Sequence, residues 1–230
     1  MSGYDVLRLA VTPAPDLPGG FQVEVYVNDD EMTSAGAGLG MDPRQILTPV
    51  NRLEAAPEPR TTPFARCDCG DYGCGVTDVT ITRDGDAVHW DWSVELPINR
   101  RVSFAADQYD TEITRMAADN SWETPERTAA RLVEIQADRA ALTTHGLSFS
   151  WAANDHRDPA TFRVAVMLGS DYQIFVGTPW RDHTPESLAA EVCENLAQGP
   201  GRWRATWHPV HSGVPGPPPI ARPSWRQEQV

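Results

Sequence analysis

The chain has 230 residues, of which 40% are hydrophobic and 22% charged, so it is long enough to bury a sizeable globular core. Its formal net charge is −13, which argues against binding to nucleic acids or anionic membranes, because both require basic patches. Residues 1–122 carry 20 acidic residues and 9 arginines, whereas residues 123–230 carry 12 and 10. The acidic N-terminal half is therefore compatible with a basic protein partner.

The N-terminus, read over residues 1–10, lacks the basic and then apolar pattern of a signal peptide. No stretch approaches the ~20 apolar residues of a membrane-spanning helix. We therefore expect a cytoplasmic protein, in which cysteines stay reduced and clustered cysteines indicate metal binding or packing. All 19 basic residues are arginine, which is typical of the coding bias of a high-GC bacterial genome.

Alternating apolar residues predict strands over residues 4–12 and 21–27, and the turn-rich segment between them predicts a hairpin. Asp42-Pro43 is typical of a helix start, and Pro49 limits that helix to a short one. Residues 52–63 read as a loop.

A second hairpin is predicted over residues 79–94, with a type I′ turn at Asp84-Gly85. Such a turn pairs Thr80 with His89. The apolar residues of the second strand alternate and share one face, which we expect to be the core face of the strand central to the first sheet. These residues are Val88, Trp90, Trp92 and Val94.

Helices and strands alternate in the rest of the chain. The pattern predicts helices around residues 109–116, 124–145 and 184–198, and strands over residues 147–152, 162–168, 172–177 and 202–207. From Pro209 onward the chain is rich in proline and is predicted to be extended or disordered, the alternative being a docked arm anchored by Trp225.

This order of elements predicts an α+β fold with antiparallel or mixed sheets and three main helices. We expect two lobes. The first, residues 1–120, is β-rich and the second, residues 121–208, is α+β, and both precede a tail over residues 209–230.

The densest motif is Cys-Asp-Cys-Gly-Asp-Tyr-Gly-Cys-Gly over residues 67–75. Cys67, Cys69 and Cys74 could ligate zinc, but a structural zinc site needs a fourth ligand. His89 is the nearest histidine in sequence, yet the predicted register places it roughly 20 Å along the strand from Cys74. The remaining candidates have no recognisable spacing: Asp68, Asp71, Cys193, His145, His156 and His183.

Two other interpretations of the motif stay open. In a redox pair, Cys74 would join Cys67 or Cys69, whereas Cys67 and Cys69 are roughly 6.6 Å apart if extended, which disfavours their pairing. Alternatively, the three cysteines are small side chains buried where the glycine-rich turn packs against the tryptophan hairpin.

The Cys-x-Cys-Gly-x-x-Gly-Cys-Gly string is followed by Val-His-Trp at 88–90, by Phe104 and Tyr109, and by Ser-Trp-Glu at 121–123. In these residues the chain resembles uncharacterised proteins of high-GC actinobacteria. The resemblance covers about the middle third of the chain and implies a bacterial, intracellular setting. It brings no catalytic residues with it.

We interpret the chain first as a non-enzymatic protein-interaction module, for instance an immunity-type or antitoxin-like protein that neutralises a basic partner. The second hypothesis is a zinc-stabilised or zinc-dependent small enzyme that uses Cys67, Cys69 and Cys74. The third is a structural component of a larger assembly. Histidines beside carboxylates at 154–158 and 181–183 are interpreted as polar loops.

Overall fold

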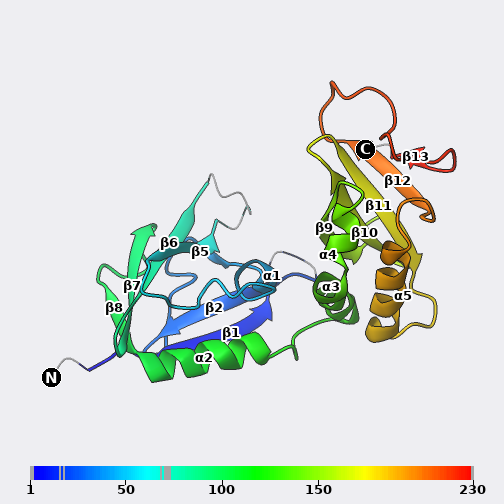
Figure 1. The fold of residues 1–230 in the computed structure, drawn as a ribbon. Helices are drawn as coiled ribbons and strands as arrows, with labels where there is room; N and C mark the ends of the chain where they lie inside the picture. Colours follow the sequence, from blue (N-terminus) through cyan, green and yellow to red (C-terminus); the bar gives the residue numbers. More distant parts are fainter. Residues whose placement is uncertain (1–2, 16, 18, 68, 70–73, 229–230) are drawn as a thin grey trace. The chain divides into compact units, whose positions relative to one another are not determined.

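The computed structural model is that of an α+β protein, as predicted from the sequence (Figure 1). The chain divides into two compact units, Met1–Trp122 and Glu123–Val230. Among the described residues, no helix combines the length and the apolar character needed to span a lipid bilayer. The structure describes residues 3–15, 17, 19–67, 69 and 74–228.

In the described part of the first unit, the strands form two antiparallel sheets. The smaller sheet has the order β1 (Leu7–Pro13), β2 (Phe21–Val27) and β3 (Asp30–Glu31). The larger sheet has the order β4 (Leu39–Gly40), β5 (Arg60–Arg66), β6 (Val76–Asp84), β7 (Ala87–Val94) and β8 (Val102–Ala105). The helices are α1 (Pro43–Ile46), whose N-cap is Asp42, and α2 (Ala106–Ala118).

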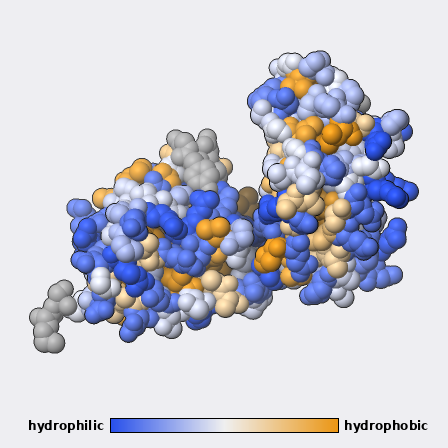
Figure 2. Space-filling model, viewed as in Figure 1, coloured by the Kyte–Doolittle hydropathy of each residue, from blue (hydrophilic) through white to orange (hydrophobic). Residues whose placement is uncertain are grey.

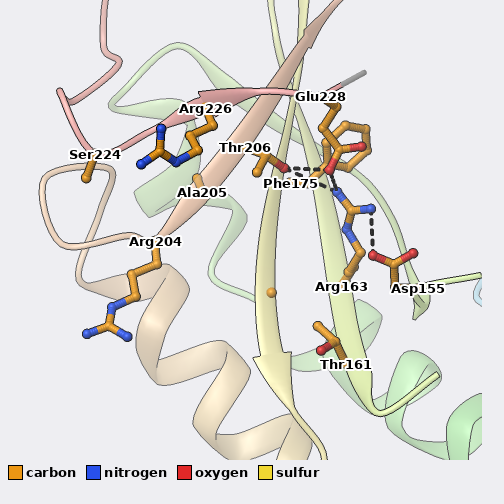
Figure 3. Close-up of a pocket in the computed structure, with 11 residues that line it drawn as sticks. Asp155, Thr161, Arg163, Phe175, Arg204, Ala205, Thr206, Ser224, Arg226 and Glu228 are labelled. Carbon is orange, nitrogen blue, oxygen red and sulfur yellow. Dashed lines mark hydrogen bonds and ion pairs between the residues drawn. The ribbon is translucent and has the colours of Figure 1, made fainter. Parts of the chain in front are cut away.

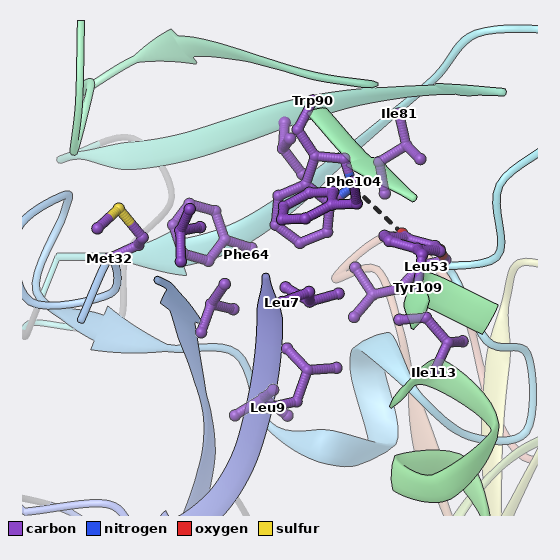
Figure 4. Close-up of a cluster of buried hydrophobic side chains, with 14 of the residues drawn as sticks. Leu7, Leu9, Met32, Leu53, Phe64, Ile81, Trp90, Phe104, Tyr109 and Ile113 are labelled. Carbon is purple, nitrogen blue, oxygen red and sulfur yellow. Dashed lines mark hydrogen bonds between the residues drawn. The ribbon is translucent and has the colours of Figure 1, made fainter. Parts of the chain in front are cut away.

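Aromatic residues of β7, β8 and α2 form the core of the first unit (Figure 4). The completely buried Trp90 ring lies edge-on to Phe104 and Tyr109, with centroid distances of 5.4 and 6.0 Å. Trp90 Nε1 donates a hydrogen bond to the Tyr109 hydroxyl at 3.2 Å, and that hydroxyl donates to the Leu53 carbonyl. The polar atoms of both rings are thus satisfied inside an apolar core.

Helix α2 also protects the outer edge of β1, which is an edge strand of its sheet (Figure 1). Gln108 accepts from the Leu7 amide at 3.2 Å and donates to its carbonyl at 2.7 Å, as a neighbouring strand would. Glu112 accepts from the Leu9 amide and Arg115 donates to the Leu9 carbonyl. These side chains satisfy backbone groups that would otherwise be open to pairing with another chain.

The tryptophan hairpin is present, but its predicted register is wrong. Asp84 pairs with Ala87, and His89 pairs with Thr82 rather than Thr80. The turn residues are Gly85 and Asp86, and Gly85 adopts φ = +55° at the first of the two turn positions. The type I′ assignment at Asp84-Gly85 is therefore also wrong, because the glycine occupies the first turn position rather than the second.

Three further expectations for the first unit are corrected. The predicted loop over residues 52–63 ends in β5, which sequence alternation misses because Pro63 lies at a register shift in the strand. The central strand of the larger sheet is β6, not the tryptophan strand β7. Val94 does not face the core, since 66% of its surface is exposed at the end of β7.

The described strands of the second unit form one sheet with the order β13-β12-β11-β10-β9. Its apolar face packs on α3 and α5, whose N-caps Thr124 and Thr184 lie where the predicted helices begin, each followed by a proline. The elements are α3 (Pro125–Gln136), α4 (Arg139–Thr143), β9 (Leu147–Asn154), β10 (Thr161–Leu168), β11 (Tyr172–Pro179), α5 (Pro185–Ala197), β12 (Ala205–Pro209) and β13 (Arg226–Gln227).

The long helix predicted over residues 124–145 is broken into α3 and α4. Asp138 adopts an extended conformation between them, and its carboxylate accepts from the Ala141 amide at 2.9 Å. Asp138 therefore acts as the N-cap of a new helix, which competes with continuation of the first. Ile135, near the end of α3, is 63% exposed, although the apolar pattern of one continuous helix over residues 124–145 would bury it.

The proline-rich tail is docked on its own unit, which is the alternative to the disorder expected from its composition. Trp225 is buried and lies nearly parallel to Trp203, with centroids 6.5 Å apart and an interplanar angle of 6°. Trp225 Nε1 donates to the Trp203 carbonyl at 3.2 Å, and β13 pairs in parallel with β12. The proline-rich composition predicts that the tail stays disordered and keeps its conformational entropy. Burial of Trp225 and pairing of β13 with β12 offset the entropy that is lost when the tail docks.

Asp5 joins separate segments of the first unit. Its carboxylate accepts from the Arg100 guanidinium at 2.7 and 2.9 Å, from the Ser103 amide at 3.1 Å and from the Asn28 amide group at 2.7 Å. These hydrogen bonds, that of Arg100 foremost, lower the pKa of Asp5 to about 2 from its ordinary value of 3.8. The folded state therefore favours the ionised carboxylate.

We expect Asp5→Asn to lower the free energy of unfolding at neutral pH by about 1–2 kcal/mol. Because the pKa is lowered in the folded state, this stabilisation is complete above the unfolded value of 3.8 and lost as the pH falls through about 2. Urea denaturation followed by tryptophan fluorescence measures it at each pH. Asp84→Asn, at an exposed position, is the matched control and should change the free energy of unfolding little. If Asp5→Asn were as destabilising near pH 2 as at neutral pH, the lowered pKa of Asp5 would be contradicted.

Candidate metal centre

The cysteine motif forms the connection between β5 and β6. The Cys67 amide donates to the Gly75 carbonyl at 2.9 Å, which closes the base of this loop directly beyond the last strand pair, Arg66 with Val76. The motif is thus the end of a hairpin preceding the tryptophan hairpin, and both share β6. Asp68 and Asp71, two of the predicted candidate ligands, lie outside the described residues.

The hairpin brings the sulfur atoms of Cys67, Cys69 and Cys74 within 4.8 Å of one another. A tetrahedral zinc ion with Zn–S bonds of about 2.3 Å requires sulfur atoms about 3.8 Å apart. The three thiols therefore need only a small contraction to share one ion. Cys67 is half-buried, whereas Cys69 and Cys74 are exposed, so an ion can reach the cluster from solvent.

The close approach of the sulfurs opposes the ionisation of Cys74 when no cation is present. Hydrogen bonding to the Cys67 and Cys69 sulfurs, together with charge repulsion, raises the pKa of Cys74 to about 12 from its ordinary value of 9.0. A bound divalent cation reverses this effect, because it favours the thiolate form of each ligand. The cluster is thus electrostatically suited to hold a cation.

Of the three interpretations of the cysteines, packing is wrong for Cys69 and Cys74, because both side chains are exposed. A redox role for Cys74 is disfavoured at neutral pH, since its raised pKa keeps the thiol protonated and only the thiolate is nucleophilic. Metal binding does not require the thiols to be ionised beforehand, because the cation displaces the thiol protons as it binds.

His89 is not close enough to complete the site. It lies opposite Thr82, six positions along β6 from Val76, which corresponds to roughly 20 Å of extended strand. Its Nδ1 atom is hydrogen bonded to the Ser103 hydroxyl at 2.8 Å. The exclusion of His89 thus holds, although the register from which it was predicted was wrong.

The other predicted ligands lie in the second unit and have contacts there. Cys193 packs beside the core of that unit, and burial raises its pKa. His183 lies 3.0 Å from Glu191, and His156 lies 3.7 Å from Asp155. Among the described residues, the metal-ligating cluster consists of Cys67, Cys69 and Cys74.

Glu95 lies beside the base of the cysteine loop. A side chain at Gly75 would meet its carboxylate, because a Cβ atom there would be 2.6 Å from Glu95 Oε1. The Glu95 amide donates to the Val76 carbonyl at 3.2 Å, and the Glu95 carbonyl accepts from the Thr77 hydroxyl at 2.8 Å. These two hydrogen bonds fix the backbone of Glu95. Glycine at position 75 thus lets a negative charge sit next to the cluster.

No family model, curated protein or solved structure matches the chain. The resemblance to actinobacterial proteins stays a prediction, and the function has to be inferred from the geometry of the molecule.

Sequence reasoning missed an arginine network in the second unit. Arg163, nine-tenths buried, donates to Asp155 at 3.0 Å and also to Glu228, although Asp155 was interpreted only as part of a polar loop. The available signal in the sequence was the position of Arg163, a charged residue between the apolar residues Phe162 and Val164 of β10. A buried charge in such a strand requires partners.

In the metal-free protein, we expect iodoacetamide to modify Cys74 slowly at about pH 8 despite its exposure, because a pKa of about 12 leaves few thiolates. The rate should keep rising beyond the ordinary cysteine pKa of 9.0. Mass spectrometry of the labelled peptides at increasing pH measures this. The matched control is Cys67→Ser with Cys69→Ser, which should restore a plateau near the ordinary value; a plateau there in the unaltered chain would refute the prediction.

Proposed function

We propose that the chain is a zinc-binding protein and that Cys67, Cys69 and Cys74 supply three thiolate ligands from the β5–β6 hairpin. The observation that carries this proposal is the approach of the three sulfur atoms to within 4.8 Å of one another. Thiolates are soft ligands that suit zinc, whereas magnesium and calcium prefer oxygen. Zinc is therefore the ion that best matches this donor set.

Three ligands from one loop suggest how the ion would act. Zinc would join residues on both sides of the loop and restrict its conformations, as a covalent cross-link does. A tetrahedral ion would accept one more ligand, from the loop, from solvent or from another molecule. A site completed by another molecule would combine the zinc hypothesis with the protein-interaction hypothesis, and a site completed by water would allow hydrolytic chemistry.

Zinc content tests the proposal directly. We expect the chain, purified without chelators, to contain about one equivalent of zinc by elemental mass spectrometry. Cys74→Ser should lose most of it, whereas Cys193→Ser, which replaces the half-buried cysteine of α5, should retain it. Less than about one-tenth of an equivalent in the unaltered chain, after growth with added zinc, would rule out this function.

A second candidate function is contact with a basic protein, which one end of the first unit favours. The Arg83 amide donates to the Ala56 carbonyl and the Ala106 amide to the Asp86 carbonyl, so the β6–β7 turn meets the 54–58 segment and the start of α2. Exposed carboxylates of these segments outnumber the arginines Arg52, Arg60 and Arg83. The exposed carboxylates are Glu54, Glu58, Asp84, Asp86, Asp107 and Asp110.

We infer that this acidic end contributes most of the electrostatic attraction to a basic partner. Hydrophilic residues predominate on the face of the first unit drawn in Figure 2, which fits a polar, salt-sensitive contact better than a permanent apolar one. Neutralisation of a basic partner in the manner of an immunity protein is the specific form we propose. A role within a larger assembly stays a prediction.

Affinity capture from the source cell at about 50 and 500 mM salt tests this inference. We expect a basic protein to be retained at low salt and lost at high salt, because exposed charges are screened. Combined Asp84→Asn, Asp86→Asn and Asp107→Asn should abolish its capture. The same charge change in the second unit, through Asp171→Asn, Asp182→Asn and Glu194→Gln, should not; equal loss with both sets would contradict an acidic contact on the first unit.

A further inference from the structure

A cavity of about 440 Å³ lies on the sheet of the second unit, within the size range of small-molecule sites (Figure 3). Residues of β10, β11, β12 and β13 line it, so the docked tail supplies one wall. Alternate residues of β10, such as Phe162 and Val164, face the helices and belong to the core. The cavity therefore lies on the face opposite α3 and α5.

The acidic residues of the cavity already have partners. Arg163 joins Asp155 to Glu228, and its guanidinium lies 4.3 Å from the centroid of the Phe175 ring. The Thr206 hydroxyl donates to Glu228 at 2.7 Å. One side of the cavity is thus a polar network in which one guanidinium and one hydroxyl serve two carboxylates, so that neither carboxylate is left without a partner.

The other side carries positive charge. Figure 3 shows Arg204, Arg226 and Ser224 on the side of Thr206 away from Arg163. Arg204 and Arg226 are exposed, and neither guanidinium has a hydrogen-bond or ion-pair partner among the residues that the structure describes. In a chain with a net charge of −13, two such arginines in one cavity are available to an anionic ligand.

Gly177 lines the cavity without a side chain, and a Cβ atom there would lie 3.2 Å from Thr161 Cγ2. Gly177 pairs with Arg163 across β10 and β11, so its exposed outer face adjoins the polar network. Phe175 and Ala205 add apolar surface beside it. A ligand with an apolar body and a charged head matches this distribution.

We propose that this cavity binds a small organic phosphate. Its phosphate group contacts Arg204 and Arg226, and its apolar body covers the sheet at Gly177. Two guanidinium groups match the double negative charge of a phosphate monoester better than the single charge of a carboxylate, and the Ser224 hydroxyl offers a further donor. This site is independent of the cysteine cluster, which belongs to the first unit.

Calorimetric titration of the full chain with phenyl phosphate at constant ionic strength tests the proposal. We expect saturable binding at one site, no saturation with phenol, and clearly weaker binding of benzoate. Arg204→Ala combined with Arg226→Ala should weaken binding of phenyl phosphate by about tenfold or more, because two charge-assisted contacts are lost. Arg202→Ala, an exposed arginine outside the cavity, is the matched control and should bind like the unaltered chain.

A second variant locates the ligand without changing charge. Gly177→Leu places a side chain in the cavity and should also weaken binding, while its unfolding transition shows whether the sheet remains intact. The absence of saturation up to about 10 mM phenyl phosphate would overturn the proposal, as would unchanged affinity in the double arginine variant. Benzoate binding as tight as phenyl phosphate would overturn the assignment of the ligand as a phosphate.

Discussion

The antiparallel pairing of β5 with β6 is the constraint on which the cysteine cluster depends. It places Arg66 opposite Val76, so the Cys67 amide and the Gly75 carbonyl meet at 2.9 Å and the intervening residues must turn back within one loop. The sulfurs can approach one another only because the strands hold both ends of that loop. The same strand β6 pairs with β7, which carries the buried Trp90. The aromatic core therefore stabilises, through one shared strand, the loop that presents the thiols.

Local signals in the sequence identified elements whose causes are local. The Thr-Pro starts of α3 and α5 and the tryptophan hairpin follow from residues close together in the chain. The elements that were missed depend on distant residues. The strand β5 contains Pro63 and is defined by its neighbours. Docking of the tail through Trp225 was only the alternative to disorder, because its partner Trp203 lies 22 residues earlier in the chain. No local pattern contains that information.

The candidate sites divide in the same way. The three cysteines were predictable as candidate ligands because they lie within eight residues of the sequence, although their mutual approach requires the strand pairing. The phosphate cavity was not predictable, because Arg204 directly precedes β12 and Arg226 lies on β13, and these strands pair only after the tail docks. Arg163 gave a partial signal, yet its partner Glu228 is 65 residues away. The need of a buried arginine for an acidic partner can be inferred from the sequence, but the identity of that partner cannot.

The two units differ in the charge that they can accommodate. The first has 20 acidic residues and 9 arginines, and its thiol cluster lies beside Glu95, so its field attracts cations. The second has 12 acidic residues and 10 arginines, and it keeps Arg204 and Arg226 without acidic partners in its described part. Two exposed guanidinium groups that line one cavity without acidic partners leave positive charge there, which an anionic ligand would neutralise on binding.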